Sequence, residues 1–277
     1  MPNLSTLVFD IETIPDLANL PRRQPSDPAM SDGGAPEPTY REQPLKPALQ
    51  QVVAIAAAWI TPNGALRRLT ALGEPSWGEP ELIREMFRII IEGHPRLVGW
   101  NSNGFDLPVL VYRAMVHHIA VPEFYRFGEP YQGYRQRFDE HSHIDLMDLL
   151  SFYGASTRLK LDDMARILGI PGKLGVDGTQ VFSLYQENRT AEIRTYYETD
   201  VLTTALIWAR YAEHRGWWDA TQFTTFEQSV LAWLEARTDA KWQTFQAAWR
   251  PSFVVARHSS GDNNTAPKDS QTPSKER

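Results

Sequence analysis

Continuous apolar runs predict a set of short strands along the chain. Residues 4–12 (LSTLVFDIE) are apolar in succession rather than in alternation, which is typical of a strand buried on both faces. Four further strands are expected at 52–60, 66–72, 96–100 and 143–146. A Pro-Asn-Gly turn between the first two of these predicts that they pair as a hairpin.

Apolar residues at helical spacing follow most of these strands. Helices are predicted at 81–92 (ended by Gly93), 107–118, 161–168, 190–215, 225–237 and 240–249. Strands and helices therefore alternate after an opening three-strand meander. This order predicts an α/β fold with a mixed β-sheet flanked by α-helices.

Composition divides the chain into a main domain and less regular parts. Of its 277 residues, 42% are hydrophobic, which is enough to bury a full core. We expect the main domain at 1–215, with a proline-rich flexible insertion at 21–47. A helical extension is expected at 216–256, and a polar, disordered tail at 257–277.

Charge and composition exclude several classes of function. The longest apolar run, 52–60, is far short of the ~20 residues of a membrane span, and no signal peptide is visible. The absence of cysteine excludes disulfides and thiolate chemistry and favours a cytoplasmic location. A net charge of −6 argues against a protein that coats duplex DNA. It allows an enzyme whose bound metal ions supply positive charge where it meets nucleic acid.

Asp10 and Glu12 stand two apart on the first strand, so their side chains project from the same face. Two neighbouring carboxylates repel each other unless a cation or a proton lies between them. A D-x-E triplet by itself equally fits two solvated acids at the end of a strand.

Two more acids occupy distinctive positions. Asp106 lies between a strand and a helix, where it could instead be the helix N-cap with Pro108 in the first turn. Asp200 follows Tyr196 by four residues, so the two are expected on one helical face, although an exposed acid beside a half-buried tyrosine fits as well. The ordered set of D-x-E, N-x3-F-D and Y-x3-D is far more specific, because N-x3-F-D alone is expected roughly 0.02 times in a chain of this length.

On these motifs the chain resembles the DEDD superfamily of 3′–5′ exonucleases, which have a ribonuclease H-like fold. Within it, the chain is most similar to predicted exonucleases related to the proofreading domain of family-B DNA polymerases. The matching residues are Asp10 and Glu12, then Asn101, Phe105 and Asp106, then Tyr196 and Asp200. Tyrosine four residues before the last aspartate, with Thr195 before it, marks the DEDDy subclass. Segments 143–150 and 168–178 also resemble this group, and no polymerase domain is visible, so we expect a free-standing module.

The resemblance implies two divalent ions, Mg²⁺ or Mn²⁺, and hydrolysis that releases 5′-mononucleotides from a 3′ end. The implied metal ligands are Asp10, Glu12, Asp106 and Asp200. Tyr196 would orient the attacking water, since a phenol with a pKa of about 10 is a poor base at neutral pH. The implied substrate-binding residues are Thr13, Asn101, Phe105 and Lys173. Single-stranded DNA or a 3′ end is the expected partner, with RNA as an alternative.

Other functional interpretations remain open at this point. The chain could be a catalytically silent nucleic-acid-binding module of the same fold. A hydrolase that binds a metal through His141 and His143, with Asp145 nearby, is a further alternative, although histidines that are structural or near the substrate are favoured.

Two basic or aromatic segments could contact nucleic acid. Arg158, Lys160 and Lys173 either hold phosphates or form a solvated basic face. Residues 124–138 interleave aromatic side chains with arginines, as in a platform for single strands. Packing of these aromatic side chains on the core is the favoured interpretation.

Overall fold

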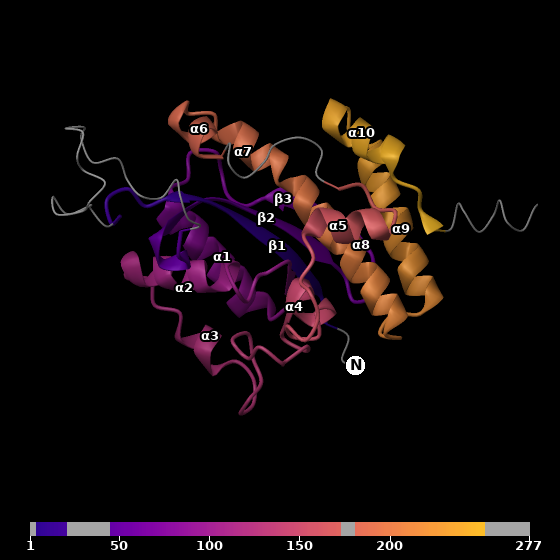
Figure 1. Ribbon diagram of the computed structural model, residues 1–277, viewed down its shortest axis with the longest axis horizontal. Helices are drawn as coiled ribbons and strands as arrows, with labels where there is room; N and C mark the ends of the chain where they lie inside the picture. The colour runs from indigo at the N-terminus through magenta and orange to yellow at the C-terminus, as the bar shows by residue number, and fades with distance from the viewer. Residues whose placement is uncertain (1–3, 21–44, 173–180, 253–277) are drawn as a thin grey trace, which may run out of the picture.

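The strands of the computed structural model form one five-stranded sheet in the order β3-β2-β1-β4-β5. Figure 1 labels β1, β2 and β3 of this sheet. The structure describes residues 4–20, 45–172 and 181–252, without the side chains of Thr195 and Tyr196. The strands are β1 (Thr6–Pro15), β2 (Gln50–Ile60), β3 (Leu66–Ala71), β4 (Arg96–Gly99) and β5 (His143–Asp145). The first three pair antiparallel, whereas β4 and β5 run parallel to β1. The predicted mixed sheet and its hairpin are therefore confirmed.

The predicted helices are present, and several shorter ones join them. The helices are η3 (Pro47–Leu49), α1 (Glu79–Gly93), α2 (Asp106–Val116), α3 (Pro122–Arg126), α4 (Leu146–Leu150), α5 (Leu161–Ile167), α6 (Val181–Gln186), α7 (Thr190–Tyr196), α8 (Glu198–His214), α9 (Ala220–Glu235) and α10 (Ala240–Ala248). The helices η3, α3, α4 and α6 were not predicted, because one or two turns carry too little periodicity to be recognised. None of the described helices has the length and apolar character of a membrane span.

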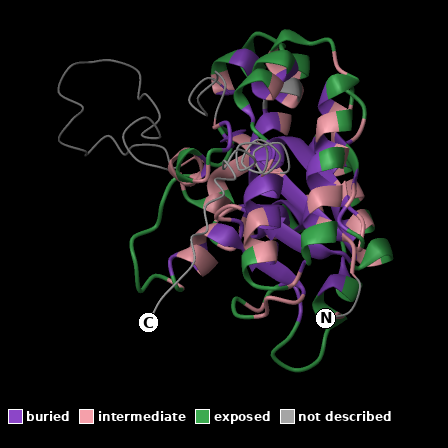
Figure 2. Cartoon of the chain, turned by 90° about the vertical axis from the view of Figure 1, so that its right-hand side faces the viewer, coloured by how far each residue is buried: buried purple, intermediate pink, exposed green. Residues whose placement is uncertain are grey.

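Helices cover both faces of the sheet, and the alternation of β1 assigns its residues to them. Leu7, Phe9 and Ile11 pack in one cluster with residues of α1 and α2. Val8 packs in another cluster with residues of α5, α8 and α9. The strands consequently form the buried centre between two helical layers (Figure 2). By the same alternation, Asp10 and Glu12 lie on the face of Val8, beneath the α8 layer.

Three predicted helix boundaries were wrong. The helix expected from residue 225 begins at Ala220, because Asp219 caps it and accepts from the amide of Gln222. The single helix expected at 190–215 is divided into α7 and α8, with Tyr197 between them. Tyr197 is buried and packs with Ile14, Val53 and Ile193, so contacts with the sheet override the local periodicity. Gly93 was expected to end α1, but His94 is the left-handed cap (φ 41°), because the following proline disfavours helical backbone at that residue.

The C-terminal helices extend the main core. Phe226 and Val230 of α9 and Trp242 and Phe245 of α10 belong to the same hydrophobic cluster as Val8. The division at residue 215 stays a prediction. Residues 21–44 of the expected insertion and residues 257–277 of the expected tail lie outside the described residues.

Candidate active site

The candidate site lies where the three parallel strands end. Val8 of β1 pairs with Val98 of β4, and Val98 pairs with Ile144 of β5. The residues that follow this row therefore reach one edge of the sheet together, among them Asp10 and Asp145. In open α/β sheets, ligands bind outside the carboxyl ends of the strands.

Asp106 is attached directly to the strand that carries the first two acids. The backbone amide of Ile11 donates a 3.1 Å hydrogen bond to Asp106 Oδ1. Because Ile11 lies between Asp10 and Glu12, the structure joins the first and second motifs although 95 residues separate Ile11 from Asp106. The alternative prediction that Asp106 is the N-cap of its helix was wrong, since Phe105 occupies that position.

A tight loop carries the chain from β4 to Asp106. Asn101 has left-handed backbone (φ 63°), and its carbonyl accepts hydrogen bonds from the amides of Gly104 and Phe105, both at 3.0 Å. A Cβ atom at Gly104 would stand 2.6 Å from Asn101 Oδ1, so a side chain there would displace that of Asn101. The loop thus fixes both Asn101 and the start of α2.

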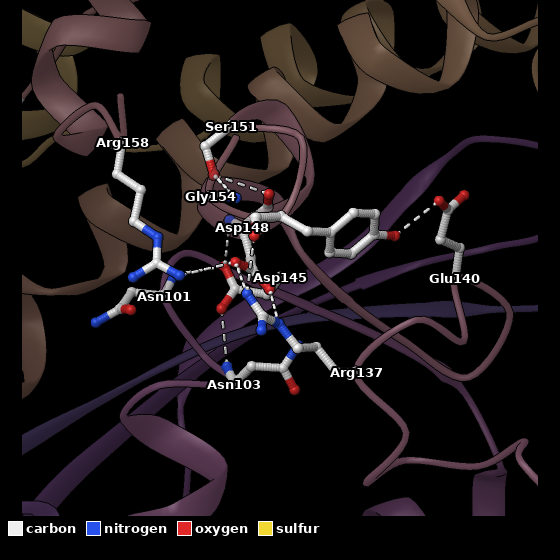
Figure 3. A network of polar contacts seen from close by, with 10 residues as sticks. Asn101, Asn103, Arg137, Glu140, Asp145, Asp148, Ser151, Gly154 and Arg158 are labelled. Atoms are coloured by element: carbon white, nitrogen blue, oxygen red, sulfur yellow. Dashed lines mark hydrogen bonds and ion pairs between the residues drawn. The ribbon is translucent and has the colours of Figure 1, made fainter. Parts of the chain in front are cut away.

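Asp145, at the end of β5, holds this loop in place (Figure 3). Its Oδ1 accepts from the amide of Asn101 and its Oδ2 from the amide of Asn103, both at 2.9 Å. Sequence reasoning missed this role. The signal that could have found it is an aspartate that ends a predicted strand within a segment resembling the family.

His143 supports the same loop from within the core. Its Nε2 lies 2.8 Å from Ser102 Oγ, and its ring contacts Phe9. Burial lowers the pKa of His143 to about 4, so the ring is neutral at physiological pH. His143 is a structural residue, and the alternative of a metal site built on His141 and His143 gains no support from its surroundings.

Asp200 lies on the helix that covers the Asp10 face. It is the third residue of α8, is almost fully buried, and belongs to a helix that packs on β1 and β2. Tyr196 ends the preceding helix, so the prediction that the two share one continuous helix was wrong. The side chain of Tyr196 and all of Lys173 lie outside the described residues.

The remaining predicted substrate residues flank this edge without converging on it. Thr13 follows a register shift in β1 directly after Glu12 and lies opposite Val52. Phe105 is half-buried and packs against the cluster between α1 and the sheet. Their contacts with a substrate stay predictions.

The aromatic segment 124–138 is divided between core and surface. Phe124 and Tyr134 are buried and stacked with 5.6 Å between their ring centres, as the favoured interpretation requires. Tyr131 and Phe138 are exposed at 89% and 68%.

Buried acids without a cationic partner dominate the electrostatics of the edge. Burial raises the pKa of Asp106, and burial also raises the pKa of Asp145 despite its hydrogen bonds from backbone amides. Within residues 4–20, 45–172 and 181–252, neither carboxylate forms an ion pair with a basic side chain. Asp106 therefore favours an incoming positive charge, whereas Asp145 already interacts electrostatically with Arg137.

The metal ligands implied by the family resemblance, which are Asp10, Glu12, Asp106 and Asp200, suit a hard cation. All of them are carboxylates, and oxygen ligands are those that Mg²⁺ and Mn²⁺ prefer. In the described part of the chain, no three acidic or histidine side chains stand close enough together to hold a metal ion. The fit therefore rests on the chemistry of the ligands and on the contact between Asp106 and β1.

Comparison with solved structures reveals the same fold in a larger protein. The chain superposes on the family B DNA polymerase from the hyperthermophilic archaeon Pyrobaculum calidifontis with a TM-score of 0.50 and 17% sequence identity. The superposition covers 99% of this chain and 31% of the polymerase. The chain thus spans less than a third of that protein, and the likeness confirms the ribonuclease H-like mixed sheet. No curated protein matches the chain in sequence.

Comparison with protein families assigns most of the chain. Residues 42–249 match the model described as a predicted 3′–5′ exonuclease related to the exonuclease domain of PolB. The match includes Asp106, Tyr196 and Asp200, whereas Asp10 and Glu12 precede it. The hydrogen bond from Ile11 to Asp106 ties that earlier strand to the matched region. The chain therefore belongs to the family of predicted 3′–5′ exonucleases related to the exonuclease domain of PolB.

Proposed function

We propose that this protein is a metal-dependent 3′–5′ exonuclease that removes 5′-mononucleotides from DNA, with RNA as a second substrate. One observation carries the proposal. The buried carboxylate of Asp106 accepts a hydrogen bond from the amide of Ile11, which lies between Asp10 and Glu12 at the carboxyl edge of the parallel strands. Family membership supplies the class of reaction, and the implied carboxylate ligands supply the reason for metal dependence.

Asp10, Glu12, Asp106 and Asp200 would hold two Mg²⁺ or Mn²⁺ ions. When bound, such ions supply positive charge that activates a water and stabilises the leaving 3′-oxygen. Burial disfavours the ionised form of Asp106, so this carboxylate gains most from a nearby cation. The surrounding protein keeps water away from that charge and so strengthens the interaction.

The other residues of the site position the substrate in this proposal. Asn101 would hydrogen-bond the terminal nucleotide and Phe105 would pack against it. Tyr196 would orient the attacking water. Asp145 acts indirectly, because it holds the amides of Asn101 and Asn103 and so fixes the loop that presents Asn101. Thr13 and Lys173 are further proposed contacts with the substrate.

A panel of 5′-labelled oligonucleotides tests the proposal directly. DNA and RNA, single- and double-stranded, are incubated with Mg²⁺, Mn²⁺ or a chelator, and products are resolved by length. We expect a ladder descending from the 3′ end that requires metal. Immediate loss of the label would indicate attack from the 5′ end, and binding without product in Mn²⁺ would indicate the catalytically silent module.

Two variants with a matched control locate the activity. Asp10→Ala and Asp200→Ala should abolish cleavage and leave the circular dichroism spectrum unchanged. Asp163→Ala is the control, since Asp163 is a half-exposed acid of α5 that pairs with Arg166. If Asp10→Ala or Asp200→Ala keeps the wild-type rate, the assignment of the site is wrong.

A further inference from the structure

A second polar cluster adjoins the candidate site and is centred on Asp148 of α4 (Figure 3). The Asp148 side chain is only 5% exposed. Arg137 donates to both of its carboxylate oxygens, from Nε at 2.6 Å and from an Nη atom at 2.7 Å. Arg158 donates to the same carboxylate at 2.9 Å. Two guanidinium groups thus share one buried acid.

The two arginines remain accessible although their orientation is fixed. Their side chains are 45% and 50% exposed, in contrast to the buried aspartate between them. One carboxylate against two guanidinium groups leaves a net positive charge in this triplet, in a chain whose net charge is −6. A guanidinium held by two parallel hydrogen bonds presents its remaining N–H groups in a defined plane, which suits a phosphate.

Exposed aromatic rings adjoin this pair of arginines. Phe138 is 68% exposed, and its ring centre lies 5.6 Å from the Arg137 guanidinium and 4.8 Å from the ring centre of Tyr153. Phe152, beside Tyr153 in the chain, is 76% exposed. Arg137 also donates to the carbonyl of Tyr153 at 3.2 Å. Phe138 and Arg137 therefore belong to one surface, and Phe152 follows Asp148 in the same short segment of chain.

The backbone under Phe152 is strained. Phe152, Tyr153 and Gly154 all have left-handed backbone, with φ angles of 53°, 56° and 94°. Bulky residues rarely adopt this conformation, because Cβ crowds the following carbonyl group. Backbone hydrogen bonds from Phe152 to Leu149 (3.0 Å) and from Tyr153 to Asp148 (2.7 Å) hold this turn, while the Phe152 ring stays largely in solvent. Strain of this kind is found mostly at functional sites.

Hydrogen bonds connect this cluster to the loop between β4 and α2, which carries Asn101. The amide of Asp148 donates to Asp145 Oδ1 at 3.2 Å, and the same oxygen accepts from the amide of Asn101. Asn101 in turn begins the loop that leads to Asp106. Arg137 and Arg158, which share Asp148, thus border the edge of the sheet at which the 3′ end would be cleaved.

We propose that Arg137, Phe138, Phe152 and Arg158 form a binding surface for the single-stranded nucleic acid that leads into the site. The arginines contact phosphates and the rings stack on bases, which are accessible only in an unpaired strand. Asp148 is a positioning residue that aims both arginines. This inference rests on the proposed exonuclease function, since it names the form of the substrate.

Binding measured without cleavage tests the surface. We would record the fluorescence anisotropy of labelled oligo(dT), oligo(U) and a blunt DNA duplex in the presence of a chelator. Phe152→Gly should weaken binding of single strands by about tenfold. Its melting temperature should stay equal or rise, because glycine relieves the strain. Loss of affinity together with retained or increased stability is not expected of a structural residue.

Arg158→Gln tests the charged half of the surface. Arg137 keeps its two hydrogen bonds to Asp148, so the fold is preserved. The slope of log affinity against log salt should fall by about 0.7, as for one lost phosphate contact on a single strand. Tyr112→Ala, an exposed aromatic residue of α2, and Arg166→Gln, an exposed arginine of α5, are the matched controls and should bind like the wild type.

The outcomes separate this proposal from that of the exonuclease. If Phe152→Gly and Arg158→Gln both bind with wild-type affinity and the protein degrades DNA, the proposed binding surface is wrong and the exonuclease proposal stands. Weakened binding in both variants of a protein that cleaves nothing with Mg²⁺ or Mn²⁺ would support the surface and contradict the exonuclease. Absence of single-strand binding by the wild type, or a preference for the duplex, would overturn the surface. The DNA and RNA arms identify which single strand it accepts.

Discussion

Two groups of buried acids lie beside the sheet or at its edge and differ in how their charge is compensated. Asp16, just after β1, and Glu79 of α1 surround the guanidinium of Arg113. Arg113 donates to Asp16 Oδ2 at 2.5 Å and to both oxygens of Glu79 at 2.8 and 2.6 Å. Asp106 and Asp145, at the carboxyl edge of the parallel strands, accept hydrogen bonds from backbone amides instead.

The two arrangements shift the pKa in opposite directions. Burial alone would raise the pKa of Asp16, but hydrogen bonds from Asn19 and Arg113 outweigh it and hold that pKa below its usual value. Burial dominates at Asp106 and raises its pKa. An acid neutralised within the protein serves the fold. An acid left without a cation is suited to bind one from outside, and on this distinction we regard the Arg113 cluster as structural and propose a catalytic role for Asp106.

Asp106→Asn should have the largest effect, on activity alone. The amide oxygen of asparagine can still accept from Ile11, so the fold and melting temperature of the metal-free protein should be maintained. We expect cleavage to fall about a thousandfold or more, because a proposed metal ligand is lost. Single-turnover cleavage and thermal unfolding measure the two quantities. Retained cleavage would show that Asp106 is structural, like Asp16.

Arg113→Met should have the converse effect, on stability. It leaves Asp16 buried without its cation and Glu79 with His117 as its remaining basic partner, which should lower the free energy of unfolding by about 3 kcal/mol. Urea denaturation measures this change. Arg88→Met is the control, since Arg88 makes ion pairs on the surface of α1 and should contribute well under 1 kcal/mol. Equal stability of the two variants would contradict the structural role of the Arg113 cluster.

His143 should make stability depend on pH. Its pKa in the folded protein is about 4, below the unperturbed value of 6.5, so the folded state binds fewer protons than the unfolded state. The contribution is fully present above pH 6.5 and is lost as the pH falls toward 4. We expect about 2 kcal/mol to be lost between pH 6.5 and 5. Urea denaturation across this range should show a shallower pH dependence in His143→Asn, whereas His118→Asn, at an exposed position, should behave like the wild type.

Much of the fold could be predicted from the sequence because its signals are local. The buried character of residues 6–15, the hairpin turn and the helical spacing of α1, α2 and α9 each depend on residues within a short window. The division between α7 and α8 could not be predicted, because it depends on the burial of Tyr197 beside Ile14 and Val53. The same applies to Asp145, whose function depends on amides more than 40 residues away.

The sequence by itself determined the order of strands and helices and the spacing of Asp10, Glu12, Asp106 and Asp200, because alternation, helical period and motif are properties of neighbouring residues. Only the tertiary structure decided that Asp16 pairs with a basic side chain whereas Asp106 accepts a hydrogen bond from a backbone amide. Arg113 reaches Asp16 across 97 positions, and Asp106 reaches Ile11 across 95. Burial and charge compensation depend on contacts of this range, and they distinguish the acids that stabilise the fold from the one for which we propose a role in catalysis.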